Sequence, residues 1–251
     1  MALEFYHWEP VANSAEPLIL LLEKGLDFTS RYVDLLAFAQ FAPTFLALNP
    51  LGQVPVLVHD GQVITETGFI LQYLDEAFPE PSFTPDTALG RYAVGVWIKH
   101  VNDYMAPAAW KLAVGKDGAP GGDRKQSGAA LAGAPIERQQ AWGAAAEGFD
   151  DETLALARAA LASSFRQMED ALQAGPWLAG ADYSLADIAV FPTAMALPDL
   201  LPDLVNSAAT PAVLAWLDRV AQRPAVRATL ALARVNRTGA FAPGPEGGRW
   251  G

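Results

Sequence analysis

Two short polar segments near the start of the chain have residue types and a spacing that suit peptide binding. In Gln53-Val54-Pro55, a proline that lacks an N–H stands at the entrance of an apolar, strand-like run. A cis bond before Pro55 would leave the N–H and C=O of Val54 free to pair with an extended peptide as an added strand. Glu66-Thr67 opens a helical run, where N–H groups and a hydroxyl favour a carboxylate and Glu66 can receive an ammonium group. Together the segments predict a site for a short, extended peptide.

The elements that must position these segments alternate between strands and helices. Apolar patterns predict strands at residues 3–6, 28–33, 56–59 and 63–65, and helices at 15–24, 43–48 and 66–78. Asp60-Gly61 lies between the last two strands, as in a hairpin. This β-α-β-α-β-β-α order indicates an α/β, thioredoxin-like domain over residues 1–79.

Helical patterns account for most of the remaining chain. Several prolines after residue 78 mark a linker, and helices are predicted at 86–113, 150–174, 184–197, 210–221 and 224–234. Ser184 and Asp187 form an S-x-x-D capping box before an apolar run. We therefore expect an all-α domain over 86–236, with a surface loop at 115–134. The tail at 237–251 is rich in glycine and proline, which predicts flexibility.

The chain resembles the glutathione transferase superfamily in two separated segments. One runs from Pro50 to Thr67, and the other is Trp177-Leu178-Ala179-Gly180-Ala181-Asp182-Tyr183-Ser184-Leu185-Ala186-Asp187. The resemblance implies the two-domain glutathione transferase fold, glutathione as co-substrate without a metal, and a homodimer. Glutathione would then be the extended peptide, and its predicted binding residues are Gln53, Val54, Pro55, Glu66 and Thr67.

Catalysis in this superfamily uses a donor near the start of the first helix to stabilise the glutathione thiolate. A free thiol has a pKa of about 8.5, and lowering it by roughly two units requires about 2.7 kcal/mol of thiolate stabilisation. Ser14 is the predicted hydroxyl donor, with Asn13 as an amide donor beside it; helix capping is the alternative role of both. Tyr6 is a rival thiolate donor. His7 is either a base or a solvated loop residue.

The resemblance extends to the bacterial glutathione-dependent β-etherases, which cleave lignin-derived β-aryl ethers. It includes Ala12-Asn13-Ser14, Glu23-Lys24-Gly25-Leu26, Arg223-Pro224-Ala225-Val226 and an insertion around residues 135–149. It implies that the glutathione thiolate displaces an aryloxide from the carbon beside a ketone, which gives a thioether and a phenol. The alternatives are glutathione transfer to other electrophiles and a non-catalytic ligand-binding protein of the same fold.

An aromatic substrate needs an apolar wall. Trp8, Tyr104 and Trp110 lie near the places where the second-substrate cleft of the superfamily forms, so they are the predicted substrate contacts. Packing in the hydrophobic core is the alternative role of the two tryptophans, since large aromatic side chains contribute much of core burial.

One departure from the superfamily concerns the glycine carboxylate of glutathione. Relatives often bind it with a basic residue of the irregular second helix, but residues 35–51 contain no Lys, Arg or His. Gln40 is the predicted substitute, and a solvated polar side chain is its alternative role. Lys99 or His100 could assist from the second domain.

Composition excludes several classes of protein. The net charge of −11 opposes binding to nucleic acid and to anionic membranes. The chain has no cysteine, which excludes disulfides, thiolate metal sites and a nucleophilic thiol of its own. No basic leader and no 18-residue apolar window without a charge are present, so we expect a cytoplasmic protein.

Overall fold

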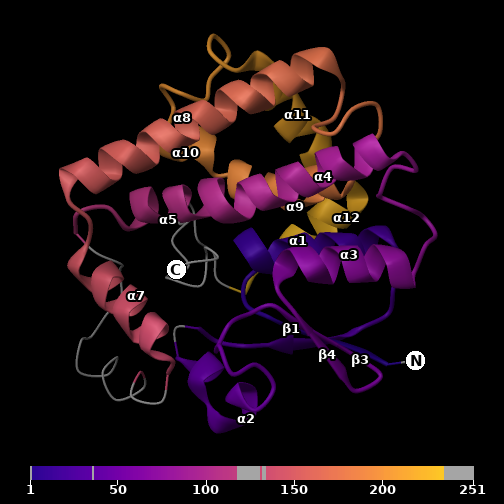
Figure 1. Ribbon diagram of the computed structural model, residues 1–251, viewed down its shortest axis with the longest axis vertical. Helices are drawn as coiled ribbons and strands as arrows, with labels where there is room; N and C mark the ends of the chain where they lie inside the picture. Colours follow the sequence, from indigo (N-terminus) through magenta and orange to yellow (C-terminus); the bar gives the residue numbers. More distant parts are fainter. Residues whose placement is uncertain (1, 36, 118–130, 132–133, 235–251) are drawn as a thin grey trace.

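The computed structural model describes residues 2–35, 37–117, 131 and 134–234 (Figure 1). A four-stranded sheet with its helices forms the first part of the chain, and a layer of helices forms the second. The predicted fold class is therefore confirmed. The predicted flexible tail at 237–251 and most of the predicted loop at 115–134 lie outside the described residues.

The sheet has the strand order β2-β1-β3-β4. β1 pairs in parallel with β2, with Phe5 opposite Ser30, and antiparallel with β3, with Phe5 opposite Leu57. β3 and β4 form the predicted hairpin across Asp60-Gly61. The elements of this part are β1 (Leu3–His7), α1 (Ala12–Glu23), β2 (Thr29–Tyr32), the 3-10 helix η1 (Ala39–Phe41), α2 (Pro43–Leu46), β3 (Val56–His59), β4 (Gln62–Thr65) and α3 (Thr67–Ala77).

The second part is built from helices (Figure 1). Its elements are α4 (Ala88–His100), the π-helical segment η2 (Val101–Met105), α5 (Ala106–Val114), α7 (Ile136–Glu147), α8 (Asp151–Ala174), α9 (Leu185–Ala194), α10 (Leu197–Leu200), α11 (Pro211–Ala221) and α12 (Pro224–Leu230). Of these, α9 and α12 pack on α1, and α9 also contacts α3. The capping box predicted at Ser184 and Asp187 is confirmed at the start of α9.

Three features of the helical part differ from the sequence expectation. The helix predicted at 86–113 is interrupted by η2, and the helix predicted at 184–197 ends at Ala194 before the short α10. α7 was not predicted, because its sequence is rich in alanine and lacks a clear apolar face.

One hydrophobic core joins the two parts. It contains Phe5 and Leu20 from the first part and Ile188, Phe191 and Trp216 from the second, all of them buried. Because α1 contacts α3 on one side and α9 and α12 on others, it is surrounded by apolar side chains. This burial fixes α1, the helix whose first turn carries Asn13 and Ser14.

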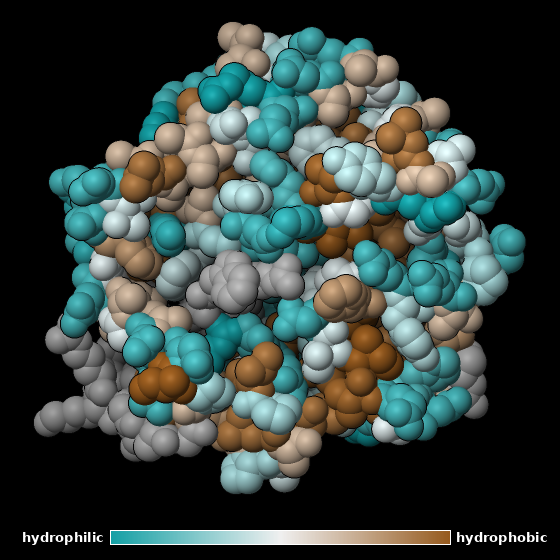
Figure 2. Space-filling view, in the orientation of Figure 1, coloured by the Kyte–Doolittle hydropathy of each residue, from teal (hydrophilic) through white to brown (hydrophobic). Residues whose placement is uncertain are grey.

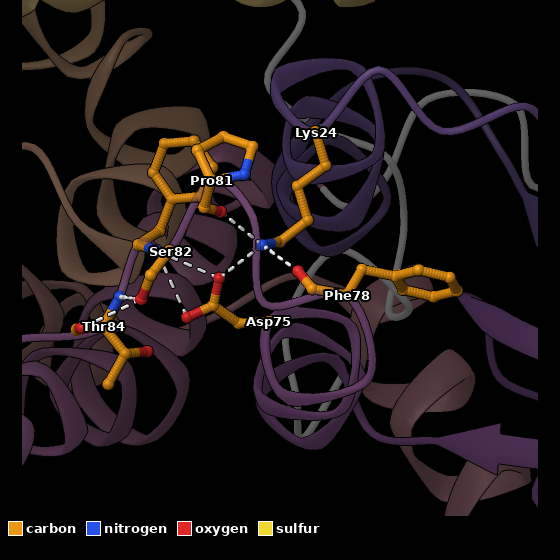
Figure 3. Close-up of polar contacts among 7 residues, drawn as sticks. Lys24, Asp75, Phe78, Pro81, Ser82 and Thr84 are labelled. Atoms are coloured by element: carbon orange, nitrogen blue, oxygen red, sulfur yellow. Dashed lines mark hydrogen bonds and ion pairs between the residues drawn. The ribbon is translucent and has the colours of Figure 1, made fainter.

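A buried ion pair fixes the ends of α1 and α3 to the linker that follows them (Figure 3). Lys24 Nζ lies 2.7 Å from Asp75 Oδ1 and donates hydrogen bonds to the carbonyls of Phe78 (2.7 Å) and Pro81 (2.6 Å). The Asp75 carboxylate also accepts from the N–H of Phe83 at 3.0 Å. The side chains of Lys24 and Asp75 are 0% and 4% exposed. A charge buried this completely requires such a set of partners.

Replacing Lys24 by methionine should strongly destabilise the protein. Lys24→Met leaves the buried Asp75 carboxylate without its cation, a change that typically costs about 3–5 kcal/mol of unfolding free energy. Urea-induced unfolding measures the loss. Arg158→Met is the matched control, because Arg158 pairs with Asp203 in an exposed ion pair and should lose no more than about 1 kcal/mol. Equal losses in the two variants would contradict the role given to burial.

A second buried carboxyl group, Glu16, lies halfway along α1. α12 runs antiparallel to α1, since Arg223 binds Glu23 at one end and the N–H of Arg234 binds Glu9 at the other. Glu16 is fully buried, and its carboxyl oxygens have no hydrogen-bond partner among the described residues. Burial raises the pKa of Glu16 well above its usual value. The two cations at the C-terminal end of α1, Lys24 and Arg223, are already bonded to Asp75 and Glu23.

Glu16 should make stability depend on pH. A carboxyl group with a raised pKa in the folded state contributes its full stability below the unfolded-state pKa near 4.5, and that stability is lost as the pH rises through the folded-state pKa. Glu16→Gln removes this loss, so the variant should gain on the parent by up to about 1.4 kcal/mol per pH unit in that window. Urea unfolding across the pH range tests this, with Glu76→Gln, an exposed carboxylate of α3, as control. Parallel pH profiles of parent and Glu16→Gln would refute it.

Candidate functional site

A cavity of about 210 Å³ lies between the sheet part and the helical part. Four segments contribute to its wall: the first turn of α1, the loop before β3, the start of α3, and the junction of α4 and η2. The lining residues are Asn13, Asn49, Gln53, Val54, Pro55, Glu66, Thr67, Gly68, Phe69, Gln72, Gly95, Ile98, Lys99 and Asn102. The wall is rich in amide side chains, which suits a ligand with several hydrogen-bonding groups.

The loop before β3 presents Gln53, Val54 and Pro55 to this cavity. The Val54–Pro55 bond is cis, which confirms the sequence expectation. Asn49 holds the loop in place, since its amide donates to the carbonyl of Gln53 at 2.8 Å and accepts from the N–H of Leu51 at 3.1 Å. Asn49 was not predicted as a site residue, although its place at the head of the loop gave a local signal.

Glu66 and Thr67 border the cavity at the N-terminus of α3. Glu66 has φ +68°, a left-handed conformation that costs a non-glycine residue energy and that often marks a functional position. Thr67 is buried and is the first residue of the helix. The arrangement directs the N-terminal end of α3, with its partial positive charge, toward the cavity.

The helical part closes the cavity through α4 and η2. Gly68 allows this close approach, because a Cβ at that position would lie 2.8 Å from Ile98 Cγ2. Asn102, in the π-helical segment, is buried and donates its amide to the carbonyl of Ile98 at 2.9 Å. Lys99 and Glu66 carry charge among the lining residues, and Lys99 also pairs with Asp103 on its own helix.

The two predicted thiolate donors lie at different places in the first turn of α1. Asn13 lines the cavity, and its Oδ1 atom is buried with no hydrogen-bond partner among the described residues. Rotation of the amide can present either oxygen or NH₂ to the cavity. Ser14 is buried and is not a lining residue; its hydroxyl accepts from the N–H of Trp8 at 3.2 Å. Neither side chain caps the helix, whose N-cap is Val11.

Tyr6 and His7 make packing and hydrogen-bond contacts with other residues of the sheet part. The ring of Tyr6 packs edge-on against Phe45, with centroids 6.3 Å apart. His7 is buried at the end of β1, and its Nε2 lies 2.7 Å from the hydroxyl of Ser30. Burial lowers the pKa of His7, although a hydrogen bond to the carbonyl of Trp8 opposes the shift. The interpretation of His7 as a solvated loop residue is therefore wrong.

Four other predicted residues do not line the cavity. Gln40, in η1, is fully buried, so its alternative role as a solvated side chain is wrong. Trp8 packs in a cluster with Val54 and other apolar residues of the sheet part, and Trp110 packs edge-on against Phe149. Tyr104 is 56% exposed on η2. Their direct contact with ligands remains a prediction.

Sequence reasoning missed most of the contribution of α3 and α4. Gly68, Phe69, Gln72, Gly95, Ile98 and Asn102 reach the cavity only because α4 packs on the start of α3. No local motif identifies them, since the contact depends on tertiary packing. Lys99 was considered only as an auxiliary cation.

The described residues hold neither a cluster of metal-ligating side chains nor a helix that could cross a membrane. Within the part of the chain that the structure describes, no group of three or more His, Asp or Glu side chains is arranged to hold a metal ion. Within the same residues, no helix has both the length and the apolar composition that a bilayer crossing requires.

Comparison with known proteins links the sequence and the fold to one family. Residues 1–76 match the family model "Glutathione S-transferase, N-terminal domain", and residues 105–224 match "Glutathione S-transferase, C-terminal domain". The chain is 36% identical over 237 residues to protein LigF of Sphingobium sp., covering 90% of this chain and 92% of LigF. It is 30% identical to glutathione S-transferase 3 of Zea mays, over 91% and 93% of the two chains. The crystal structure of the β-etherase LigF matches with a TM-score of 0.85 at 35% identity, over 92% of this chain and 99% of that one.

Proposed function

Because this chain belongs to the glutathione S-transferase family, an enzyme family, we propose that it cleaves β-aryl ether bonds of lignin-derived aromatic ketones with glutathione. The observation that carries the proposal is the likeness to the β-etherase LigF, which extends over nine-tenths of the chain in sequence and in fold. Residues 1–79 would form the glutathione-binding domain and residues 86–236 the substrate domain.

The cavity supports glutathione as the co-substrate. The backbone of Val54, with Gln53 beside it, would pair with the extended peptide. The γ-glutamyl carboxylate would meet the N-terminus of α3 at Thr67, and Glu66 would receive the ammonium group. Lys99 follows Ile98, whose side chain lies against Gly68 at the start of α3. Lys99 therefore adds positive charge near the N-terminus of α3. Gln40, which is fully buried and is not a lining residue, stays the proposed hydrogen-bonding partner of the glycine carboxylate.

The first turn of α1 would keep the thiol ionised. Asn13 is the lining residue of this turn, so its amide NH₂ is the proposed donor to the thiolate. Ser14 would act beside it by holding the N–H of Trp8, with its own O–H still available as a donor. The helix N-terminus adds to the stabilisation of a thiolate.

The reaction needs little more than positioning. The thiolate sulfur attacks the carbon beside the ketone, a C–S bond forms, and the C–O bond electrons leave with the aryloxide, which solvent protonates to a phenol. The adjacent ketone activates the carbon, so holding the thiolate in line supplies much of the acceleration. Tyr104, which is exposed, is a candidate contact for an aromatic ring, whereas Trp8 and Trp110 are buried at 3% and 5% exposure.

A second copy of the chain is the proposed partner. Phe69 on α3 and Leu89, Tyr92 and Val96 on α4 are large apolar side chains with exposed fractions from 45% to 76%. Leu89, Tyr92 and Val96 follow one face of α4 at helical spacing. α3 and α4 lie toward the viewer in Figure 1, and Figure 2 shows apolar residues among polar ones on this face. Phe69 also lines the cavity, so a partner on this face would border the site.

The proposed reaction predicts phenol release from a racemic guaiacyl β-aryl ether ketone only when glutathione is present. Chiral chromatography of the residual substrate shows whether one enantiomer is consumed. Release of phenol that depends on glutathione supports the β-etherase function. Glutathione binding without phenol release, but with conjugation of another electrophile, would favour a different transferase reaction. Binding of apolar ligands without glutathione would favour a non-catalytic role.

The same assay separates the two thiolate donors. Asn13→Ala should lower turnover about tenfold to 100-fold, because a hydrogen bond to a charged group contributes roughly 1.5–3 kcal/mol. Ser14→Ala should lower it less, with glutathione affinity within severalfold of the parent. The pH dependence of kcat/KM provides the second readout, since loss of a donor raises the pKa of the bound thiol. Unchanged turnover in both variants would remove these residues from the mechanism.

The proposed homodimer should dissociate when a charge is placed on α4. Tyr92→Glu puts a carboxylate in the centre of the apolar face, where burial is unfavourable for an unpaired charge. Light scattering after size exclusion measures the mass of the particle. Leu156→Glu, an exposed apolar position on α8, is the control and should remain dimeric. A monomeric parent protein would show that the proposed dimer does not form. Dissociation by Leu156→Glu alone would place the interface on another face.

A further inference from the structure

Trp142 of α7 contacts the first part of the chain. Its ring lies 5.1 Å from the ring of Phe38, in the segment between β2 and η1, at an angle of 56°. The C-terminal end of α7 is held separately: Ala145 is fully buried in a cluster with Trp110, and the N–H of Phe149 binds the carbonyl of Gly115 at 2.9 Å. α7 is therefore attached to α5 at its end and reaches the sheet part through Trp142.

Phe38 has an unusual backbone conformation for an aromatic residue. Its φ is +56° and its ψ is +30°, the left-handed region that is strained for side chains other than glycine. Strain of this kind persists only where surrounding contacts outweigh it. The contacts here are Trp142 on one side and Phe41 on the other, with the rings of Phe38 and Phe41 stacked at 6.4 Å.

Phe41 in turn packs against the loop that lines the cavity. It is buried, and a Cβ at Gly52 would lie only 2.6 Å from its ring. Gly52 has φ +62°, and its N–H binds the carbonyl of Asn49 at 2.9 Å. The next residues along the chain are Gln53 and Val54, which line the cavity. The ring of Phe41 thus lies directly against Gly52 and restricts the positions that this residue can take.

We propose that Trp142 is a positioning residue for glutathione binding, which acts through the stack Trp142–Phe38–Phe41 on the loop at Gly52. The identity of the ligand rests on the proposed function; the stack does not. Docking of α7 favours the left-handed Phe38 and so the bound position of Gln53 and Val54. By linkage, glutathione must favour the docked position of α7 to the same extent.

Binding and kinetics of Trp142→Ala test this role. The dissociation constant of glutathione, measured by isothermal titration, should rise about threefold to tenfold, the range usual for substitutions along a coupled network. KM for glutathione should rise equally with kcat unchanged at saturation, because the variant loses binding common to ground and transition states. Trp142→Phe should restore most of the affinity. Gln140→Ala, at an exposed position on the same helix, is the matched control and should bind like the parent.

A double-mutant cycle shows whether the effect passes through Phe38. Phe38→Leu keeps an apolar side chain without the aromatic contact, and it also serves if Trp142→Ala fails to fold. The double variant should bind glutathione as well as whichever single variant binds it more weakly. The effects do not add, because both substitutions remove the same contact between Trp142 and Phe38. Hydrogen exchange of residues 136–147 should slow on addition of glutathione to the parent and not to Phe38→Leu.

The outcomes separate the two proposals. A parent protein that binds no glutathione overturns both. A parent that binds it while Trp142→Ala binds equally well, or strictly additive effects in the cycle, overturns the role of Trp142 and leaves the proposed reaction intact.

Discussion

The buried ammonium group of Lys24 acts together with the hydrophobic core to fix how α1 and α3, two helices that border the cavity, lie. It joins the C-terminal end of α1 to Asp75 in the last turn of α3, and these helices have nearly the same length. Their N-termini therefore lie at the same end of the molecule, where Asn13 and Thr67 both line the cavity. Two positive helix ends thus face one site, which suits a ligand with a thiolate and carboxylates. The site depends on an interaction at the far ends of both helices.

The parts of the fold and site that sequence could predict are those with local causes. Strand and helix order followed from apolar periodicity, and Val54, Pro55, Glu66 and Thr67 were found because proline geometry and a helix start act within a few residues. The alternative role of Gln40 as a solvated side chain was wrong, because Gln40 is buried in η1, a 3-10 helix that follows the left-handed Phe38. The α4 side of the cavity could not be predicted, since its residues meet α3 only through tertiary packing.

Two of the three helical features that differ from the sequence expectation, η2 and α7, also depend on tertiary contacts or on single side chains. η2 interrupts a continuous apolar pattern where the Asn102 side chain bonds the carbonyl of Ile98, so a side chain and the backbone compete for one acceptor. Segments of this type are frequent at functional sites, and Asn102 does line the cavity. α7 has weak amphipathic character, and it is held by a few contacts, Ala145 in the cluster of Trp110 and Trp142 against Phe38, rather than by a broad apolar face.

The non-glycine residues with positive φ fall into two groups, one that a tight turn requires and one that no local turn explains. Among the described residues, Asp60, Phe38 and Glu66 are the non-glycine residues with positive φ. At Asp60 the β3–β4 hairpin itself requires it, because tight hairpin turns use left-handed residues and aspartate tolerates them. No such local requirement exists at Phe38 or Glu66, so packing must offset a cost of roughly 1–3 kcal/mol at each. Glu66 lines the cavity, and Phe38 stacks on Phe41, whose ring packs against Gly52 in the loop before β3. A backbone relaxed at either position would gain stability and would lose the arrangement on which the proposed binding of glutathione depends.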